Sequence, residues 1–350
     1  MKKTTGDQAG GGQKRLQMAD IARLAGVSTA TVSRALSHSP RVNEETRQRI
    51  LTLAGSLKYS INIGAQNLRT RQNRTIAVMI PVDAGRHQHL SDPFLLTMLG
   101  SLADALTEQG FEMLFSRIRT DQLAEAAVPF DTGRTIGVIL VGQWGRHDQL
   151  NALAARGVPL VVWGAQLPQQ LYCCIGGDNV SGGTLATEHL LQLGRRRIAF
   201  FGDIALPEPQ QRYRGYCAAL ASRKLDVDPL LQVSVPFLPE GGEQAVRELA
   251  RRGVTYDAVF ACSDLLAMTA IDSLRAQGAA VPEQVAVVGY DDVGPAAYFH
   301  PRLTTVRQPI AAAGQALVSS LLAIIDGKPA ASVELPTELI VRASCGTPAH

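Results

Sequence analysis

Positively charged side chains, which can bind a polyanion, are concentrated in the first 75 residues of this 350-residue chain. That segment holds 13 Lys and Arg against 4 Asp and Glu, whereas the remainder holds 21 against 27. Such a division predicts an anionic partner for the N-terminal segment, either a nucleic acid or a membrane surface. A solvated basic tail is the alternative interpretation.

Within this basic segment, residues that can begin helices lie at the spacing of a helix-turn-helix. Ser28 follows a glycine-containing turn at residues 25–27, and its hydroxyl can accept a hydrogen bond from a free backbone N–H. Asn43 precedes two glutamates, whose charges suit the positive end of a helix dipole. We therefore predict three short amphipathic helices between residues 18 and 59, the second of which would enter the major groove of DNA.

Side-chain patterns for catalysis or metal binding do not occur in this sequence. The motifs GxxxxGK[ST], GxSxG and HExxH are missing, and no GxGxxG follows a strand. The five cysteines have no CxxC spacing, so they are interpreted as small apolar residues. His87 and His89 lie in a polar segment, where a loop feature is the simpler interpretation than a metal site. The sequence predicts a protein that is not an enzyme and holds no cofactor or metal.

From residue 75 onward, strand-like and helical segments alternate. Continuous apolar runs rich in Val and Ile predict strands buried on both faces of a parallel sheet. These runs lie at 76–80, 137–141, 160–163, 198–201, 258–261 and 285–289. Helices are predicted between them at 94–110, 182–194, 212–223, 241–253 and 265–277. The alternation predicts two doubly wound α/β lobes, with a ligand cleft at the carboxyl ends of the strands.

Composition and hydropathy indicate the compartment. Hydrophobic residues make up 46% of the chain and charged residues 19%, without an apolar run long enough to span a bilayer. The basic start is followed by glycines instead of the apolar stretch of a secretory signal. We therefore expect a cytoplasmic protein of two or three compact units with no membrane partner.

Several blocks of sequence, taken in order, resemble the lactose-repressor (LacI/GalR) family. They are MADIARLAGVSTATVSRAL, VNEETRQRI, LKYSINIGAQNL, EHLLQLGRRRIAF, RYRGY, VVGYDD and LTTVRQP, with DN at 178–179. The match spans residues 16–345. The resemblance implies a small all-α helix-turn-helix DNA-binding domain and a hinge, followed by a periplasmic-binding-protein-like domain of two α/β lobes that binds ligand and dimerises. The corresponding ranges are 16–60, 61–74 and 75–350, after a disordered tail at 1–15.

The resemblance also implies which helix-turn-helix residues contact DNA. Thr29, Ala30 and Arg34 fall where the family's recognition helix reads base edges. Physical chemistry agrees for Arg34, because a guanidinium can donate two hydrogen bonds to one guanine. The positions that contact phosphates in the family are occupied by Ser28, Thr31, Ser33 and Asn43. A solvated helix residue is the alternative for Arg34.

The hinge of the family becomes helical when two protomers meet over the operator centre. Tyr59 begins the matching segment, Asn62 can cap its helix, and Ala65 and Leu68 share one face at i, i+3 spacing. Leu68 matches the leucine that relatives insert into the minor groove, where such a wedge kinks the duplex. The alternative is that Leu68 packs against its own domain.

For the large domain the resemblance implies a cleft that binds a small effector, a sugar or a sugar derivative. The matching positions are Phe94, Arg212, Phe237, Ser263, Asp264 and Asp291. Aromatic faces suit the C–H surfaces of a sugar, and ionised side chains suit its hydroxyls. A turn-forming role for Asp291 and a local ion pair for Arg212 are alternatives. Gly164 stands where several sugar-binding relatives carry an aspartate, so the ligand cannot be transferred from them.

Three classes of function account for different parts of the sequence. A stand-alone sugar-binding protein accounts only for the lobes, and a sugar-modifying enzyme only for the fold class. A DNA-binding regulator accounts for the basic segment, the hinge and the lobes together. The sequence ends without the leucine heptads of family tetramers, which favours a homodimer. We therefore expect a regulator of carbohydrate-use genes, a repressor, whose affinity for operator DNA is controlled by the effector.

Overall fold

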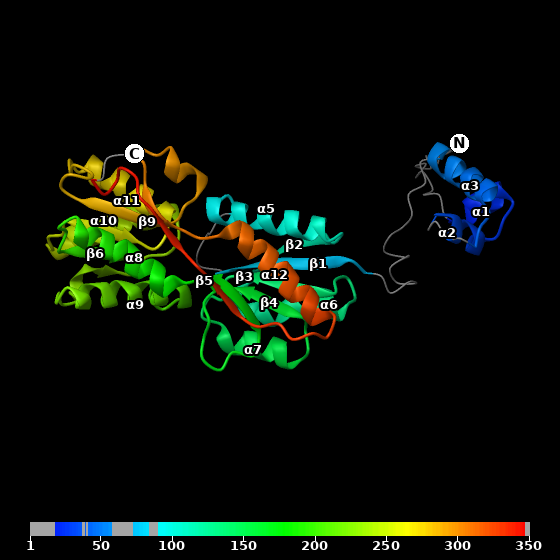
Figure 1. Cartoon of the computed structure of the whole chain (residues 1–350), viewed down its shortest axis with the longest axis horizontal. Coiled ribbons are helices and arrows are strands. Elements are labelled where there is room, and N and C mark those ends of the chain that lie inside the picture. Colours follow the sequence, from blue (N-terminus) through cyan, green and yellow to red (C-terminus); the bar gives the residue numbers. More distant parts are fainter. Residues whose placement is uncertain (1–17, 37–38, 40, 58–72, 84–89, 347–350) are drawn as a thin grey trace, which may run out of the picture. The chain divides into compact units, whose positions relative to one another are not determined.

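The chain forms two compact units, Met1–Asn73 and Arg74–His350, in a computed structural model (Figure 1). The structure describes residues 18–36, 39, 41–57, 73–83 and 90–346. The boundary between the units falls inside the segment predicted to be the hinge. The predicted tail at 1–15, most of the hinge, and His87 with His89 lie outside the described residues.

Three helices build the first unit: α1 (Met18–Ala25), α2 (Thr29–Leu36) and α3 (Glu44–Ser56). The predicted caps are confirmed, because Ser28 Oγ accepts from the Thr31 N–H at 3.1 Å and Asn43 Oδ1 accepts from the Thr46 N–H at 2.9 Å. Gly26 has a φ of +64° in the turn between α1 and α2, a conformation that glycine adopts without steric cost. The apolar faces enclose one small core of Ile21, Ala22, Ala25, Val32, Ala35, Val42 and Ile50.

The first lobe of the second unit is a parallel six-stranded sheet with helices on both faces (Figure 1). In sheet order its strands are β11 (Val333–Leu335), β5 (Cys173–Gly177), β4 (Leu160–Trp163), β3 (Gly137–Val141), β1 (Thr75–Val82) and β2 (Glu112–Arg119). Its helices are α5 (Pro93–Glu108), η1 (Thr120–Ala127), α6 (Val128–Asp131), α7 (His147–Ala155) and α12 (Ile310–Ile325). Along β1, Ile76, Val78 and Ile80 pack in the core under α5 and α12, whereas Ala77 and Met79 pack in the opposite core.

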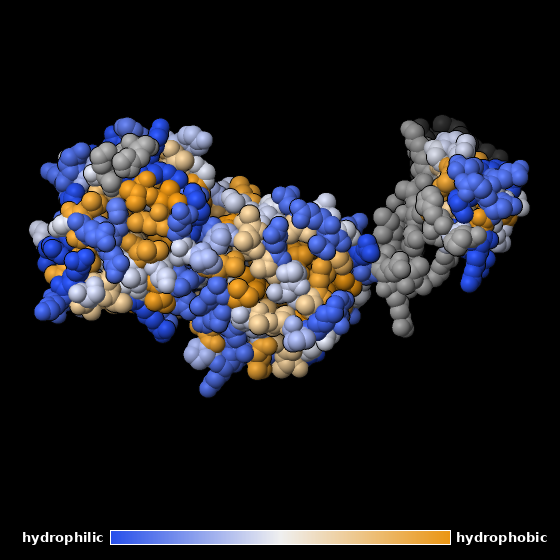
Figure 2. Space-filling view, viewed as in Figure 1, coloured by the Kyte–Doolittle hydropathy of each residue, from blue (hydrophilic) through white to orange (hydrophobic). Residues whose placement is uncertain are grey.

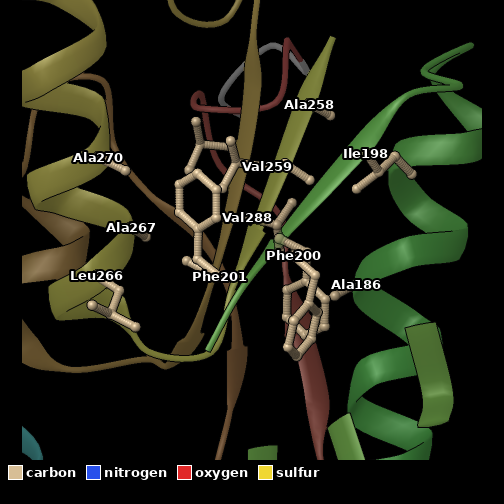
Figure 3. Close-up of a cluster of buried hydrophobic side chains, with 14 of the residues drawn as sticks. Ala186, Ile198, Phe200, Phe201, Ala258, Val259, Leu266, Ala267, Ala270 and Val288 are labelled. Carbon is tan, nitrogen blue, oxygen red and sulfur yellow. The ribbon is translucent and has the colours of Figure 1, made fainter. Parts of the chain in front are cut away.

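The second lobe repeats this arrangement around one large core. Its strands, in sheet order, are β12 (Glu338–Ile340), β10 (Thr304–Arg307), β9 (Ala286–Asp291), β8 (Ala258–Ala261), β6 (Ile198–Phe201) and β7 (Gln232–Val233); only β12 is antiparallel to its neighbour. Its helices are α8 (Asn179–Gln192), α9 (Pro207–Ser222), η2 (Pro229–Leu231), α10 (Pro239–Arg252), α11 (Asp264–Ala276) and η3 (Gly294–Ala297). Figure 3 shows Phe200 of β6 pointing toward Ala186 of α8, and Phe201 pointing toward α11 on the other face. Both faces are buried, which explains the continuous apolar runs.

The predicted fold class is confirmed: four of the six predicted strands have the predicted ends, and the other two strands and the five predicted helices are present with shifted ends. The prediction placed Arg212 at the start of its helix, which is wrong, because α9 begins at Pro207. The chain also crosses between the lobes three times, at Asp178, after β10 and after β11. These crossings return α12 and β11 to the first lobe and β12 to the second, so each lobe is completed by distant segments.

Helices α8 and α9 approach each other at two glycines. A Cβ atom on Gly215 would lie 2.1 Å from the Val180 carbonyl oxygen, and a Cβ on Gly183 would lie 2.1 Å from the Arg212 carbonyl oxygen. Both distances are far below van der Waals contact with rigid backbone. The glycines therefore set the spacing of the two helices, and with it the position of Arg212 relative to α8.

We expect Gly215→Ala to lower the unfolding free energy of the second unit by about 2–3 kcal/mol, since backbone must move to admit the methyl group. Gly100→Ala in α5 is the matched control, because a Cβ there meets no atom within 4 Å. That control should be neutral or stabilising by up to about 1 kcal/mol, as alanine favours helix over glycine. Urea denaturation measures both effects. A midpoint for Gly215→Ala equal to that of the parent protein would show that the two helices are free to separate.

Candidate functional site

Both sheets contain a point at which the strand order reverses. In the first lobe β2 lies on one side of β1 and β3 on the other; in the second lobe β7 and β8 flank β6 in the same way. The helices that leave neighbouring strands at such a point pass to opposite faces, which opens a crevice outside the carboxyl ends of the strands. The lobes therefore each offer one ligand-binding crevice.

An open cavity lies at these carboxyl ends, with walls from both lobes and about 740 Å³ of empty space when the solvent at its mouth is included. The first lobe contributes the ends of β1, β3 and β4 and the start of α5. The second contributes the last residue of β9 and residues that follow β6, β7, β8 and β10. The lining residues are Ile80, Asp92, Phe94, Leu95, Val141, Gly142, Gln143, Trp144, Trp163, Leu206, Glu208, Arg212, Phe237, Ser263, Asp291 and Gln308. This mixture of apolar walls and a few charged groups is typical of a small-molecule site.

Arg212 is the cation of the cavity wall, and its side chain is held by three groups. Its Nε donates to Asn179 Oδ1 at 2.8 Å, one Nη donates to the Cys262 carbonyl oxygen, and the guanidinium lies 3.7 Å above the Tyr290 ring centre. Only 6% of the residue is exposed. These contacts fix the orientation of the guanidinium while its remaining surface faces the cavity.

The Asp291 carboxylate enters the cavity from a turn of unusual conformation. Asp291 has a φ of +120° and Asp292 a φ of +54°, a region in which side chains other than glycine are strained by about 1–3 kcal/mol each. Asp292 forms ion pairs with Arg307 at 2.8 Å and Arg342 at 2.6 Å, which anchor the turn. Asp291 in turn accepts from Gln308 Nε2 at 2.7 Å. The conformation of this turn therefore places the Asp291 carboxylate in the wall of the cavity.

Three carboxyl groups around the cavity have raised pKa values. Burial raises the pKa of Asp291 to about 7, although Arg212 and the hydrogen bond from Gln308 act in the opposite direction. Burial also raises the pKa of Asp92, despite hydrogen bonds from the N–H groups of the following helix, and that of Glu208, despite Arg212. The cavity is therefore a poor environment for additional negative charge.

Aromatic rings supply the apolar part of the cavity. The Phe94 and Trp163 rings lie 6.4 Å apart between centroids at an interplanar angle of 39°. Trp144 follows β3 in a left-handed conformation with a φ of +50°, between two glycines of positive φ. Phe237 lines the second lobe's side of the cavity. Such ring faces suit the C–H surface of a sugar.

Five of the six predicted ligand residues, Phe94, Arg212, Phe237, Ser263 and Asp291, line the cavity. Asp264 does not, and this part of the prediction is corrected. Its fully buried carboxylate accepts from the Val293 N–H at 2.8 Å and from the Thr305 hydroxyl. Ser263 and Asp264 adjoin at the start of α11, but Ser263 faces the cavity and Asp264 turns beneath the 291–293 turn, which it supports.

Sequence reasoning missed several lining residues, among them Trp144, Trp163, Glu208 and Gln308. Trp144 and Trp163 follow or end predicted strands, so the rule that ligands bind at carboxyl ends could have found them. Gln308 lies in the block LTTVRQP, to which no role was assigned. Glu208 precedes the predicted start of its helix and gave no sequence signal. Among the described residues no cluster of three or more His, Cys, Asp or Glu could hold a metal ion.

Gln143 explains the glycine at position 164. A Cβ on Gly164 would lie 2.6–2.8 Å from the side chain of Gln143, which is itself almost fully buried. Gln143 accepts from the Ala165 N–H at 3.0 Å and donates to the Ala165 carbonyl oxygen and the Tyr172 hydroxyl. The amide thus occupies the space that a larger residue at position 164 would need.

In the first unit, helix α2 has one buried and one accessible face. Val32 and Ala35 are buried in the core. The predicted DNA-contacting residues Thr29, Ala30, Ser33 and Arg34 lie at i and i+4 spacing on the other side, and Ser28 and Asn43 are exposed at the starts of α2 and α3. Thr31 and Ser33 are half-buried. Tyr59, Asn62, Ala65 and Leu68 lie outside the described residues.

Known proteins match both units. Residues 17–62 match the family described as bacterial regulatory proteins, lacI family, and residues 187–345 match the periplasmic binding protein-like domain. The HTH-type transcriptional regulator CelR of Thermobifida fusca is 34% identical over 341 residues, covering 95% of this chain and 99% of CelR. This chain belongs to the LacI family of bacterial regulators. It is accordingly a DNA-binding transcription regulator with an N-terminal helix-turn-helix.

Solved structures agree with this assignment. A CelR–cellobiose complex has a TM-score of 0.72 at 31% identity, covering 94% of this chain and 100% of that one. A lac repressor dimer bound to operator and the anti-inducer ONPF has a TM-score of 0.84 at 24% identity, covering 95% and 99%, which shows the shared fold. None of the helices in the described part of the regulator is long and apolar enough to cross a membrane.

We predict that Asp291 makes the regulator less stable as the pH rises from about 4 to about 7. Its pKa is higher in the folded protein than the ordinary 3.8, so the folded state binds the proton more tightly. The stabilising contribution is complete below pH ~4 and is lost as the pH passes ~7. Denaturation at about pH 5 and about pH 8 should show a loss at least ~1 kcal/mol larger for the parent than for Asp291→Asn. The exposed Asp326→Asn is the control, and an identical pH profile in all three proteins would contradict the prediction.

Proposed function

We propose that this regulator is a cytoplasmic homodimeric repressor of carbohydrate-use genes, whose affinity for operator DNA is controlled by a sugar-like effector in the cavity. The observation that carries the proposal is the cavity wall itself, where Arg212, Asp291 and Ser263 face aromatic rings from the other lobe. The charged groups can form hydrogen bonds with hydroxyl groups, and the rings on the opposite wall can cover C–H faces. This combination suits a carbohydrate. The complex of CelR with cellobiose supports the same ligand class.

Operator recognition is assigned to the accessible face of α2. Arg34 and Ala30, one turn apart, can reach base edges, together with Thr29. Phosphate contacts are assigned to Ser28, Thr31, Ser33 and Asn43, because small polar side chains at the start of a helix or on its accessible side can donate to phosphate oxygens. The predicted hinge contacts of Tyr59, Asn62, Ala65 and Leu68 stay part of this proposal.

The homodimer follows from the geometry of helix-turn-helix recognition. One recognition helix covers a single half-site, so an operator with two symmetric half-sites requires two copies of the helix. Figure 2 shows mainly tan and white residues over α12 of the first lobe, where Ala311, Ala312 and Ala316 are partly or fully exposed. A surface with so little charge is compatible with contact between protomers.

Effector control is explained by the two walls of the cavity. Arg212 and Asp291 belong to the second lobe, whereas Phe94, Trp144 and Trp163 belong to the first. A ligand that contacts both walls binds most tightly when the lobes are closed around it, and it shifts the protein toward that state. The described cavity residues include no histidine or cysteine, and the relatives are regulators, so we propose binding without catalysis.

Arg34→Ala should weaken binding to the operator by about 1–3 kcal/mol and relax the base preference at one symmetric pair of positions. The operator is obtained by selecting palindromic sites from a random library with the full-length protein. Fluorescence anisotropy with the selected site and its single-base variants measures both effects. Arg251→Ala, an exposed residue of α10, is the charge-matched control. Unchanged base preference in Arg34→Ala would contradict the assignment of α2 as the reading helix.

Arg212→Ala should bind the operator normally without effector but respond poorly to it. Hydrogen bonds to a charged group contribute roughly 1.5–3 kcal/mol, so effector affinity should fall about 10- to 100-fold. The first probe is cellobiose, measured by calorimetry and by release of labelled operator. Arg212→Lys keeps the charge and provides a second variant if Arg212→Ala does not fold. Unchanged cellobiose affinity in both folded variants would contradict the site.

A further inference from the structure

We propose that the cavity selects an uncharged carbohydrate and discriminates against sugar phosphates and sugar acids. This inference rests on the proposed function and narrows the class of effector. Its basis is the arrangement of the protein's own carboxylates, which occupy the places where an anionic ligand would be held.

Helix N-termini are the usual anion sites of an open α/β fold, because their free N–H groups and the helix dipole favour negative charge. Three helices begin at the wall of this cavity: α5, α9 and α11. A cavity that bound a phosphate would leave at least one of these ends open to it. In this protein two of the three ends carry a carboxylate at the cavity wall, and the third is capped by the Ser263 hydroxyl.

The start of α5 is closed by Asp92, which lines the cavity. Its Oδ1 accepts from the Phe94 N–H at 2.9 Å and from the Leu95 N–H at 3.3 Å. Pro93, the first residue of the helix, has no N–H to offer. These two N–H groups of the first turn therefore already donate to a carboxylate of the protein, and an incoming anion would be repelled by that negative charge.

The start of α9 carries Glu208, the second residue of the helix and also part of the cavity wall. Pro207 and Pro209 flank it and remove two N–H donors from the first turn. The dipole at this end already acts on the Glu208 carboxylate. Burial raises the pKa of Glu208, although a backbone hydrogen bond and the charge of Arg212 act in the opposite direction.

The start of α11 is capped by Ser263, whereas the Asp264 carboxylate lies beneath the 291–293 turn, away from the cavity. Ser263 Oγ accepts from the Leu266 N–H at 3.2 Å, and Asp264 places a fully buried carboxylate in the first turn. Arg212 is the basic residue among those that line the cavity, and Asp92, Glu208 and Asp291 are the acidic ones. Two of its three nitrogen positions donate to Asn179 and to the Cys262 carbonyl oxygen. Charge on the wall is therefore negative in balance, while hydroxyl groups can still donate to the carboxylates.

The test compares matched neutral and phosphorylated sugars on the full-length protein. The probes are glucose with glucose 6-phosphate, and cellobiose with its 6′-phosphate, measured by thermal shift and calorimetry. We expect a neutral probe to bind and its phosphorylated form to bind at least about tenfold more weakly. A phosphorylated form that binds more tightly than its neutral parent would overturn the inference and leave the proposed function standing. If no probe of either kind binds, the proposed function fails together with the inference.

Single substitutions show which side chains cause the preference for neutral over phosphorylated sugars. Glu208→Gln keeps the size of the side chain and removes its charge, so the ratio between neutral and phosphorylated affinities should shrink by about threefold or more. Asp92→Asn, which keeps a capping oxygen, should act in the same direction and provides a second variant if Glu208→Gln folds poorly. Glu243→Gln, on the exposed face of α10, is the matched control and should leave the ratio unchanged. A constant ratio in both cavity variants would overturn the inference.

Discussion

The buried guanidinium of Arg212 is the constraint on which the cavity depends. A charge with 6% exposure needs partners on every side that faces protein, and Asn179, the Cys262 carbonyl oxygen and the Tyr290 ring supply them. These partners come from the start of α8, the residue after β8 and the end of β9. One side chain therefore ties together the elements that form the second lobe's wall, and any ligand meets a cation whose orientation is already set.

The carboxylates around this cation are placed by backbone features rather than by direct ion pairs with it. Asp92 is directed by the cap of α5, Glu208 by the first turn of α9, and Asp291 by a strained turn. The cost of that turn is offset by the ion pairs of Asp292 with two arginines. Because desolvation raises the pKa values of the three groups, the cavity holds hydrogen-bond acceptors whose charge is only weakly compensated.

The same architecture explains how a small ligand can act on the whole second unit. Two sheets of equivalent strand order present their crevices to one cavity, and three crossings of the chain join the lobes. In the proposed function, the lobes close by a movement about these few crossing segments, which include Asp178 and Gln308. Both lie next to residues of the site, since Asp178 precedes Asn179 and Gln308 bonds Asp291. In the proposed function, binding and lobe movement thus share the same segments.

Much of the organisation follows from the sequence alone, because it depends on local patterns. The caps Ser28 and Asn43 act on N–H groups three residues away, and the apolar runs of the central strands reflect burial on both sheet faces. Motif order was also enough to select five cavity residues. These features can be predicted from the sequence because their physical cause lies within a few residues along the chain.

Only the tertiary structure decided the rest. The three-residue strands β11 and β12 have no recognisable pattern and exist because crossings bring them to sheet edges. Ser263 and Asp264 are adjacent in sequence, yet one lines the cavity and the other is buried, since Ser263 is the extended N-cap residue and Asp264 is the first residue of α11. Trp144, Glu208 and Gln308 line one cavity because segments that follow three separate strands converge there. Which residues meet in space depends on strand order, and strand order depends on contacts between distant segments.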